Sequence, residues 1–258
     1  MDKKALLLEI DQGVAKITLN LPEVRNALSL EIRLGLVDIL RKLGEEESVK
    51  AIIITGAGKA FCSGGDIRTM EGETAVSGRL RLKRGHGLIK AMLGLEKPII
   101  GAINGIAAGA GVSIALACDF LVVSEEARFA VSFSKIGLVP DLGLYYLLPL
   151  RIGVPRAKEL MFFGDVIDAR RAETLGMVNR VVPAEKLEEE VQALARRLVQ
   201  GPSQSYAMIK SALNHWPAHL DSFLEIEATQ QAVAFSSDDF EEGRKAFLEK
   251  RKPIFQGK

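Results

Sequence analysis

Short continuous runs of apolar residues alternate with segments of helical spacing along the first half of the chain. The runs at 51–55, 98–103 and 121–123 are rich in branched side chains and predict strands buried on both faces. In the segments between them apolar residues recur with helical spacing, and Ser29 is placed to cap the first of these helices. Because helix and strand alternate from 29 to 123, the pattern predicts an α/β fold with parallel strands.

The pattern differs at the two ends of the chain. Residues 5–10 and 14–19 flank a short polar turn and predict an N-terminal hairpin. After about residue 140 the spacing is mainly helical, with a short helix capped by Asp168 and one late strand at 178–182. Further helices are expected over 184–199, 203–214, 220–235 and 238–250.

Composition changes near Gly201-Pro202, after the last predicted strand. We therefore expect an α/β core over 1–200 and a helical C-terminal region over 201–258. Of the 258 residues 48% are hydrophobic, which allows a large core and excludes an intrinsically disordered chain.

Charge and cysteine content exclude several classes of protein. The chain has 34 basic and 33 acidic residues, so no overall field attracts nucleic acid or a membrane surface. Cys62 and Cys118 are too few for a disulfide framework and indicate a reducing, cytoplasmic setting. The apolar run near the N-terminus is too short for a signal peptide, and no run is long enough to span a membrane.

Familiar catalytic and metal-binding motifs are missing from the sequence. It has no dinucleotide fingerprint, phosphate-binding loop, nucleophile elbow or zinc-protease helix. His215 and His219 are four residues apart, but Pro217 lies between them and no further ligand is near, so we expect no metal site.

Two turns built from small residues follow predicted strands. The first is Phe61-Cys62-Ser63-Gly64-Gly65-Asp66, and the second is Asn104-Gly105-Ile106-Ala107-Ala108-Gly109-Ala110-Gly111, which opens a helix. One backbone N–H from each turn can hold a single oxyanion, such as the enolate of a thioester. The alternative is tight packing of strand on helix, which glycine and alanine permit.

These two turns, followed by "FSKIGLVPDLG" and "EEGRKAFLEKRKPIF", resemble the enoyl-CoA hydratase/isomerase family, the crotonase superfamily. The resemblance covers essentially the whole chain. It implies repeated ββα units with a C-terminal helical region, and a homotrimer or a dimer of trimers. It also implies an acyl-CoA thioester as substrate and no separate cofactor, coenzyme A being part of the substrate.

The resemblance assigns roles to particular residues. The backbone N–H groups of Gly65 and Ala110 form the family's oxyanion hole. The residues matched to the cradle of the thioester and its coenzyme A are Ala60, Cys62, Gly64, Asp66, Ile67, Arg68 and Gly109. Arg68 can equally be a solvated surface charge.

The reaction depends on acids near the helix that opens at Gly109. Hydratases of the family use two glutamates, and their positions here hold Ser113 and Phe133. Asp141 matches the acid of members that move double bonds, where it would remove a proton from the γ-carbon and reprotonate the α-carbon. Without the resemblance, Asp141 reads as a helix N-cap. A nucleophilic Asp141, as in the aromatic dehalogenases of the family, has no independent support.

Several alternatives stay open. Members of this isomerase type usually read Gly-Gly-Thr where this chain has Gly143-Leu144-Tyr145, and either Tyr145 or Tyr146 could donate a proton, although a buried aromatic role is favoured. Asp141 could instead activate water in a hydratase. The fold could also serve a non-catalytic protein that binds CoA thioesters, with a side role on RNA. Only the basic cluster Arg79, Arg81, Lys83 and Arg84 favours RNA, and an exposed helix face accounts for it equally well.

Overall fold

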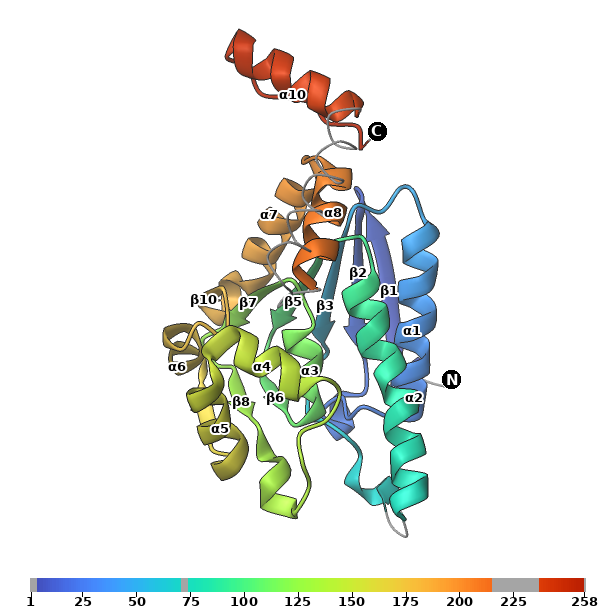
Figure 1. Ribbon diagram of the computed structural model, residues 1–258, viewed down its shortest axis with the longest axis vertical. Coiled ribbons are helices and arrows are strands. Elements are labelled where there is room, and N and C mark those ends of the chain that lie inside the picture. Colours follow the sequence, from blue (N-terminus) through green and yellow to red (C-terminus); the bar gives the residue numbers. More distant parts are fainter. Residues whose placement is uncertain (1–3, 71–73, 215–236, 258) are drawn as a thin grey trace, which may run out of the picture.

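The computed structural model describes residues 4–70, 74–214 and 237–257. Its larger sheet has six strands in the order β1-β2-β3-β5-β7-β10 (Figure 1). The strands are β1 (Leu6–Asp11), β2 (Val14–Leu19), β3 (Ala51–Gly56), β5 (Ile99–Ile103), β7 (Phe120–Ser124) and β10 (Arg180–Val182). Strands β1 and β2 form the expected antiparallel hairpin, and every later neighbour in this sheet is parallel. The predicted parallel α/β fold is confirmed.

A second, smaller sheet was not predicted. It consists of β4 (Ala60–Cys62), β6 (Ile106–Ala108), β8 (Arg128–Ala130) and β9 (Val166–Asp168). Each strand has three residues, which is too short for a period to show in the sequence. Strands β4, β6 and β8 directly follow β3, β5 and β7, and a helix follows each pair. The repeated ββα units that the resemblance implied are therefore present.

Helices surround the sheets. They are α1 (Leu30–Glu45), α2 (Ala75–Gly94), α3 (Ala110–Leu116), α4 (Leu144–Ile152), α5 (Val154–Phe163), α6 (Ala169–Thr174), α7 (Leu187–Val199), α8 (Ser203–Asn214) and α10 (Asp238–Glu249). Short 3-10 turns occur at Pro22–Val24, Ile67–Met70, Ser132–Ile136 and Ala184–Lys186. Ser29 and Asp168 cap α1 and α6 as expected, accepting from the N–H groups of Ile32 and Arg171. The helix expected over 220–235 lies outside the described residues.

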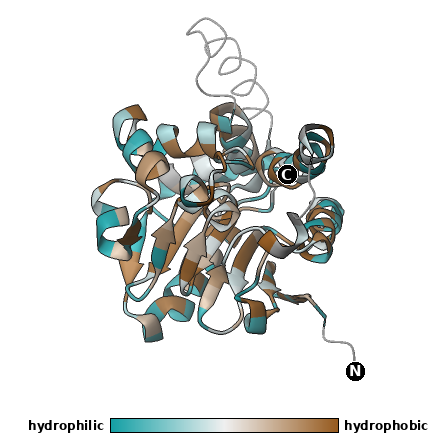
Figure 2. Ribbon diagram, turned by 90° about the horizontal axis from the view of Figure 1, so that it is seen from below, coloured by the Kyte–Doolittle hydropathy of each residue, from teal (hydrophilic) through white to brown (hydrophobic). Residues whose placement is uncertain are grey.

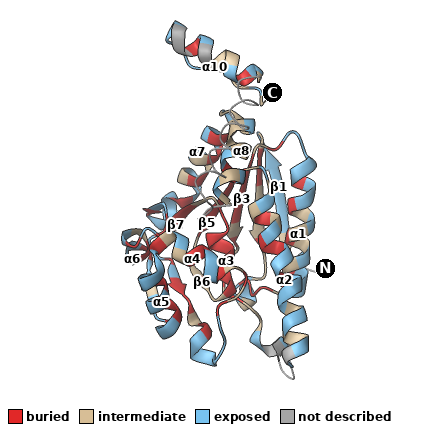
Figure 3. Cartoon of the chain, viewed as in Figure 1, coloured by how far each residue is buried: buried red, intermediate tan, exposed pale blue. Residues whose placement is uncertain are grey.

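Two separate cores lie on the two faces of the larger sheet. Ile52 and Ile54 of β3 belong to the core shared with α1, α2 and α3, whereas Ile53 belongs to the core under α7. This burial on both faces is why β3 reads as an uninterrupted apolar run. The central strands β3, β5 and β7 are buried, whereas the edge strand β1 and the outer sides of the helices are exposed (Figure 3). Figure 2 shows the same division in hydropathy.

Helix α2 is longer and less exposed than expected. The prediction was a basic, exposed helix over 79–93, but Gly85, Leu88 and Met92 are buried against the body of the protein. Helix α8 packs against α2, whereas α10 lies apart from both sheets (Figure 1). A domain boundary at residue 201 stays a prediction. Among the described residues, no helix combines the length and apolar character needed to cross a bilayer.

Candidate active site

The two turns of small residues lie backbone against backbone. Strands β4 and β6 pair in parallel and lead into them. Gly64 has φ +93°, and a Cβ built there would lie 2.6 Å from the carbonyl oxygen of Ala108 and 3.3 Å from the nitrogen of Ala110. A Cβ on Gly111 would collide with the carbonyl oxygen of Cys62. Glycine at both positions therefore permits a close approach that a side chain would block.

This approach brings backbone donors of the two turns together. Helix α3 begins at Ala110, after Gly109 at φ +50°, so the N–H of Ala110 belongs to the unpaired first turn of a helix. Gly65 is the next residue after Gly64, whose backbone makes the close contact, and its N–H is the donor from the first turn. Within the part of the chain that the structure describes, neither the amide of Gly65 nor that of Ala110 donates a hydrogen bond. Two unpaired N–H groups on neighbouring turns can bind one oxygen anion.

The segment before α1 holds the first turn in place. The N–H of Ser63 donates to Arg25 O (3.0 Å), and the N–H of Leu28 donates to Gly64 O (2.7 Å). Asn26 is fully buried, and its Nδ2 donates to Ala60 O (2.8 Å) and Ala57 O (3.0 Å). Its Oδ1 accepts from the N–H of Leu21, at 2.9 Å.

Sequence reasoning missed Asn26. Arg25 and Asn26 both have positive φ, at 52° and 55°, a conformation that asparagine tolerates better than most residues. An asparagine a few residues after Leu21-Pro22, between two predicted elements, is the signal that could have indicated a turn clamp.

Asp141 lies in the loop before α4 and is tied to α3. Its carbonyl oxygen accepts from Ser113 Oγ (3.0 Å), and Ser113 lies three residues after Ala110. Its side chain does not cap α4, because Gly143 occupies the N-cap and no side chain bonds there. The capping interpretation of Asp141 is wrong. Its Oδ1 is buried and has no hydrogen-bond partner among the residues that the structure describes.

The surroundings of Asp141 favour a carboxyl that can take up and release a proton. Burial raises the pKa of Asp141 to about 6, and the guanidinium groups of Arg33 and Arg81 oppose this rise. A carboxyl with such a pKa is largely ionised at neutral pH and can accept a proton from carbon.

Ser113 and Phe133, which occupy the positions of the two hydratase glutamates, also lie at α3. Ser113 is buried and donates to Asp141 as described. Phe133 is buried, and its ring Cζ lies 3.7 Å from where a Cβ on Gly109 would be. Ser113, Phe133 and Asp141 therefore approach the same end of α3, and only Asp141 carries an acid.

The other residues singled out from the sequence are spread around this centre. Ala60 and Cys62 are buried in β4, and burial raises the pKa of the Cys62 thiol to about 11, as fits a core residue. Asp66 is half-buried, Ile67 is exposed, and the side chain of Arg68 lies outside what the structure describes.

The tyrosines differ from expectation. Tyr145 and Tyr146 are 59% and 40% exposed, so the expected buried aromatic role is wrong for both. The buried positions of α4 are Leu144, Leu147, Leu148 and Ile152, and this spacing leaves the two tyrosines off the buried face.

The described ranges contain no group of three or more His, Cys, Asp or Glu residues that could hold a metal ion. His215 and His219 lie outside those ranges, so the absence of a metal there stays a prediction.

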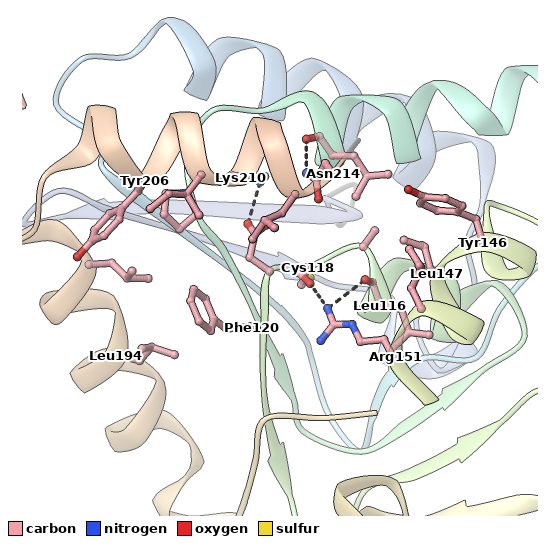
Figure 4. Close-up of a pocket in the computed structure, with 18 of the residues that line it drawn as sticks. Leu116, Cys118, Phe120, Tyr146, Leu147, Arg151, Leu194, Tyr206, Lys210 and Asn214 are labelled. Atoms are coloured by element: carbon pink, nitrogen blue, oxygen red, sulfur yellow. Dashed lines mark hydrogen bonds and ion pairs between the residues drawn. The ribbon is translucent and has the colours of Figure 1, made fainter. Parts of the chain in front are cut away.

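A hollow of about 920 Å³ lies at the opposite end of α3 (Figure 4). Lys210 reaches into its wall, donating to Asp119 Oδ2 (2.8 Å) and to Lys97 O (3.0 Å). Arg151 Nη2 donates to Cys118 O, at 2.8 Å. Tyr146 lines this hollow, but Asp141, Gly65 and Ala110 do not.

Comparison with known proteins shows the family of the chain. The enoyl-CoA hydratase/isomerase family matches residues 9–258. The chain is 36% identical to a 1,2-epoxyphenylacetyl-CoA isomerase of Escherichia coli over 98% of each protein. It is 37% identical to a probable enoyl-CoA hydratase of Rhodobacter capsulatus over the full length of both. A crystal structure of an enoyl-CoA hydratase subunit from Geobacillus kaustophilus superposes with a TM-score of 0.94, at 36% identity and 98% coverage of both chains. The chain therefore belongs to the enoyl-CoA hydratase/isomerase family of enzymes.

Proposed function

We propose that this enzyme is an enoyl-CoA isomerase, which moves a double bond of an acyl-CoA thioester with Asp141 as its acid and base. One observation carries the proposal: a buried carboxyl with an unpartnered oxygen is fixed, through Ser113, to the helix whose first N–H group is free. The two positions at which hydratases of the family carry glutamate hold Ser113 and Phe133.

The proposed reaction needs one base and one oxyanion hole. With a 3-enoyl thioester, ionised Asp141 takes a proton from the α-carbon, and the electron pair moves onto the thioester oxygen. The N–H groups of Gly65 and Ala110 stabilise the resulting dienolate. Asp141 then returns the proton to the γ-carbon, which leaves a 2-enoyl thioester. The reverse direction uses the same groups in the opposite order.

The relatives support both an isomerase and a hydratase, since one is named as each. A hydratase would require Asp141 to activate water and a second group to deliver the proton. Ser113 and Phe133 offer no carboxyl for that second task, so the isomerase is favoured. The cytoplasmic location, the role of coenzyme A as part of the substrate, and a homotrimer or dimer of trimers stay predictions.

The test uses a 3-enoyl-CoA in deuterated water, with products identified by mass spectrometry. We expect deuterated 2-enoyl-CoA from the wild type, and a rate at least about a hundredfold lower from Asp141→Asn. Asp11→Asn, an exposed change on β1, is the matched control and should leave the rate unaltered. Formation of 3-hydroxyacyl-CoA would identify a hydratase. Binding of CoA thioesters without any turnover would indicate a non-catalytic binder.

A further inference from the structure

The segment over residues 25–28 lies against the turn that carries the Gly65 N–H. Leu28 forms a parallel bridge with Gly65, and the N–H of Leu28 donates to the carbonyl oxygen of the preceding glycine, at 2.7 Å. Two residues before Gly65, the N–H of Ser63 donates to Arg25 O, at 3.0 Å. This one segment therefore fixes three consecutive residues, the last of which supplies the first oxyanion donor.

Two consecutive residues of this segment have a left-handed backbone. Arg25 and Asn26 have φ values of 52° and 55°, a conformation that costs free energy for residues with a side chain. Such a conformation persists only where the surroundings fix it, and it occurs preferentially at functional sites. Specific contacts must therefore hold the backbone at Asn26.

The side chain of Asn26 supplies these contacts. Its Nδ2 donates to the carbonyl oxygens of Ala57 and Ala60, and its Oδ1 accepts from the N–H of Leu21. The N–H of Asn26 donates in return to Leu21 O, at 2.8 Å, so two hydrogen bonds between these residues close the loop. Asn26 is fully buried, and both polar atoms of its side chain have partners.

These contacts connect Asn26 to both oxyanion donors. Ala60 begins β4, which ends just before the first turn and pairs with β6, and β6 leads into α3 at Ala110. Asn26 therefore binds the strand before the first donor, while its backbone neighbours bind the turn that contains this donor. A change at Asn26 would move the Gly65 N–H relative to the Ala110 N–H. Because stabilisation of an oxyanion requires both donors to reach the same oxygen, even a small displacement of one weakens it.

We propose that Asn26 is a positioning residue of the oxyanion hole, which holds the Gly65 N–H where it and the Ala110 N–H meet one thioester oxygen. The inference rests on the proposed function, from which it takes these two amides as the donors. Asn26 itself does not contact the reacting atoms in this role. Since the donors bind an enolate more strongly than a neutral thioester, loss of Asn26 should lower kcat far more than it raises KM.

The first test measures kcat and KM separately with a 3-enoyl-CoA, on variants whose folding is confirmed by circular dichroism at the assay temperature. Asn26→Ala should lower kcat about tenfold to a hundredfold and change KM by less than about threefold. Asn26→Gly should lower kcat similarly. Glycine adopts the left-handed φ without strain, so this variant removes the hydrogen bonds alone and stays folded if the alanine variant does not.

Asn179→Ala is the matched control. Asn179 Oδ1 accepts from the N–H of Leu121 at 2.7 Å, and the N–H of Asn179 donates to Leu121 O at 3.2 Å. This is the same reciprocal arrangement as at Asn26, in a loop that contributes no candidate site residue. Asn179→Ala should lower stability and leave kcat unchanged. Folded Asn26 variants with wild-type kcat would overturn the proposal.

The second test measures oxyanion binding without turnover. Acetoacetyl-CoA loses a proton between its two carbonyl groups, and its enolate absorbs in the near ultraviolet, so difference spectra report the bound enolate. We expect the wild type to raise the enolate fraction. Both Asn26 variants should weaken enolate binding about tenfold and change the affinity for butyryl-CoA, which stays neutral, by less than about threefold.

The outcomes separate this proposal from the proposed function. An enolate fraction that the wild type does not raise, or that the Asn26 variants leave unchanged, would overturn the positioning role. If the enolate is bound as expected but no 3-enoyl-CoA is isomerised, the proposed function fails and the positioning role of Asn26 stands.

Discussion

Replacing Gly64 by alanine tests the backbone contact on which the candidate oxyanion hole depends. Gly64 has φ +93°, and its missing Cβ would come within 2.6 Å of Ala108 O. The nearest atoms are backbone atoms of β6 and of the start of α3, which cannot rotate away as a side chain can. The added methyl group must therefore push the Gly65 turn away from Ala110, or the strand β4 away from β6.

The magnitude follows from two costs. A non-glycine residue at such a φ costs on the order of 1–3 kcal/mol. Forcing a methyl group into a closely packed site costs about another 1–3 kcal/mol. We therefore expect Gly64→Ala to lower the free energy of unfolding by roughly 2–6 kcal/mol. Displacing one oxyanion donor should also lower kcat by about a hundredfold.

Gly87→Ala is the matched control. Gly87 lies inside α2, and nothing lies within 4 Å of the position of its Cβ. Alanine there should raise the free energy of unfolding by about 0.5–1 kcal/mol, because it favours the helix more than glycine does. Urea unfolding followed by circular dichroism measures both variants, and product formation from a 3-enoyl-CoA measures kcat. A Gly64→Ala protein with wild-type stability and wild-type kcat would refute the reasoning.

Four further predictions concern titration and burial. If Asp141 is the base, kcat/KM should fall about tenfold per pH unit below pH 6, since only its ionised form accepts a proton, and should level off above pH 7. Arg33→Gln should move that midpoint to higher pH, because Arg33 lowers the pKa of Asp141. An unchanged midpoint would show that Arg33 does not influence the titration of Asp141. Asn26→Ala removes three hydrogen bonds to the backbone of Leu21, Ala57 and Ala60 and should cost about 2–4 kcal/mol in urea unfolding. Lys210→Met removes the ion-pair partner of Asp119, which keeps only the hydrogen bond from the Ile99 N–H, and should cost about 3 kcal/mol, whereas the exposed change Lys158→Met should cost under about 0.5 kcal/mol.

The central strands β3, β5 and β7 could be predicted because they are buried on both faces and read as apolar runs. The smaller sheet could not, since three residues such as Ala60–Cys62 show no period and their pairing depends on partners far along the chain. The turn at Gly64 was recognisable as a close approach, but its partner, the backbone of Ala108, became known only from the structure.

Some side chains of the candidate site could likewise be recognised in the sequence, and others could not. Asp141 could be a cap or a base in the sequence, because the choice depends on where α4 begins, and α4 begins after Gly143. Arg33 gave no signal, since a basic residue within an amphipathic helix reads as surface charge. Arg33 lies beside Gly85 of α2, a residue that no local pattern of spacing connects to it.

The meeting of Ser113, Phe133 and Asp141 at one end of α3 has a consequence for how new reactions arise on this scaffold. The amide donors come from the main chain, so substitution of these three side chains leaves them in place. The three positions come from separate segments, and a carboxyl group at any of them faces the same helix end. A single amino-acid exchange can therefore change the position of the acid relative to the thioester. The reaction catalysed at the site would then change, while the backbone groups that bind the thioester stay the same.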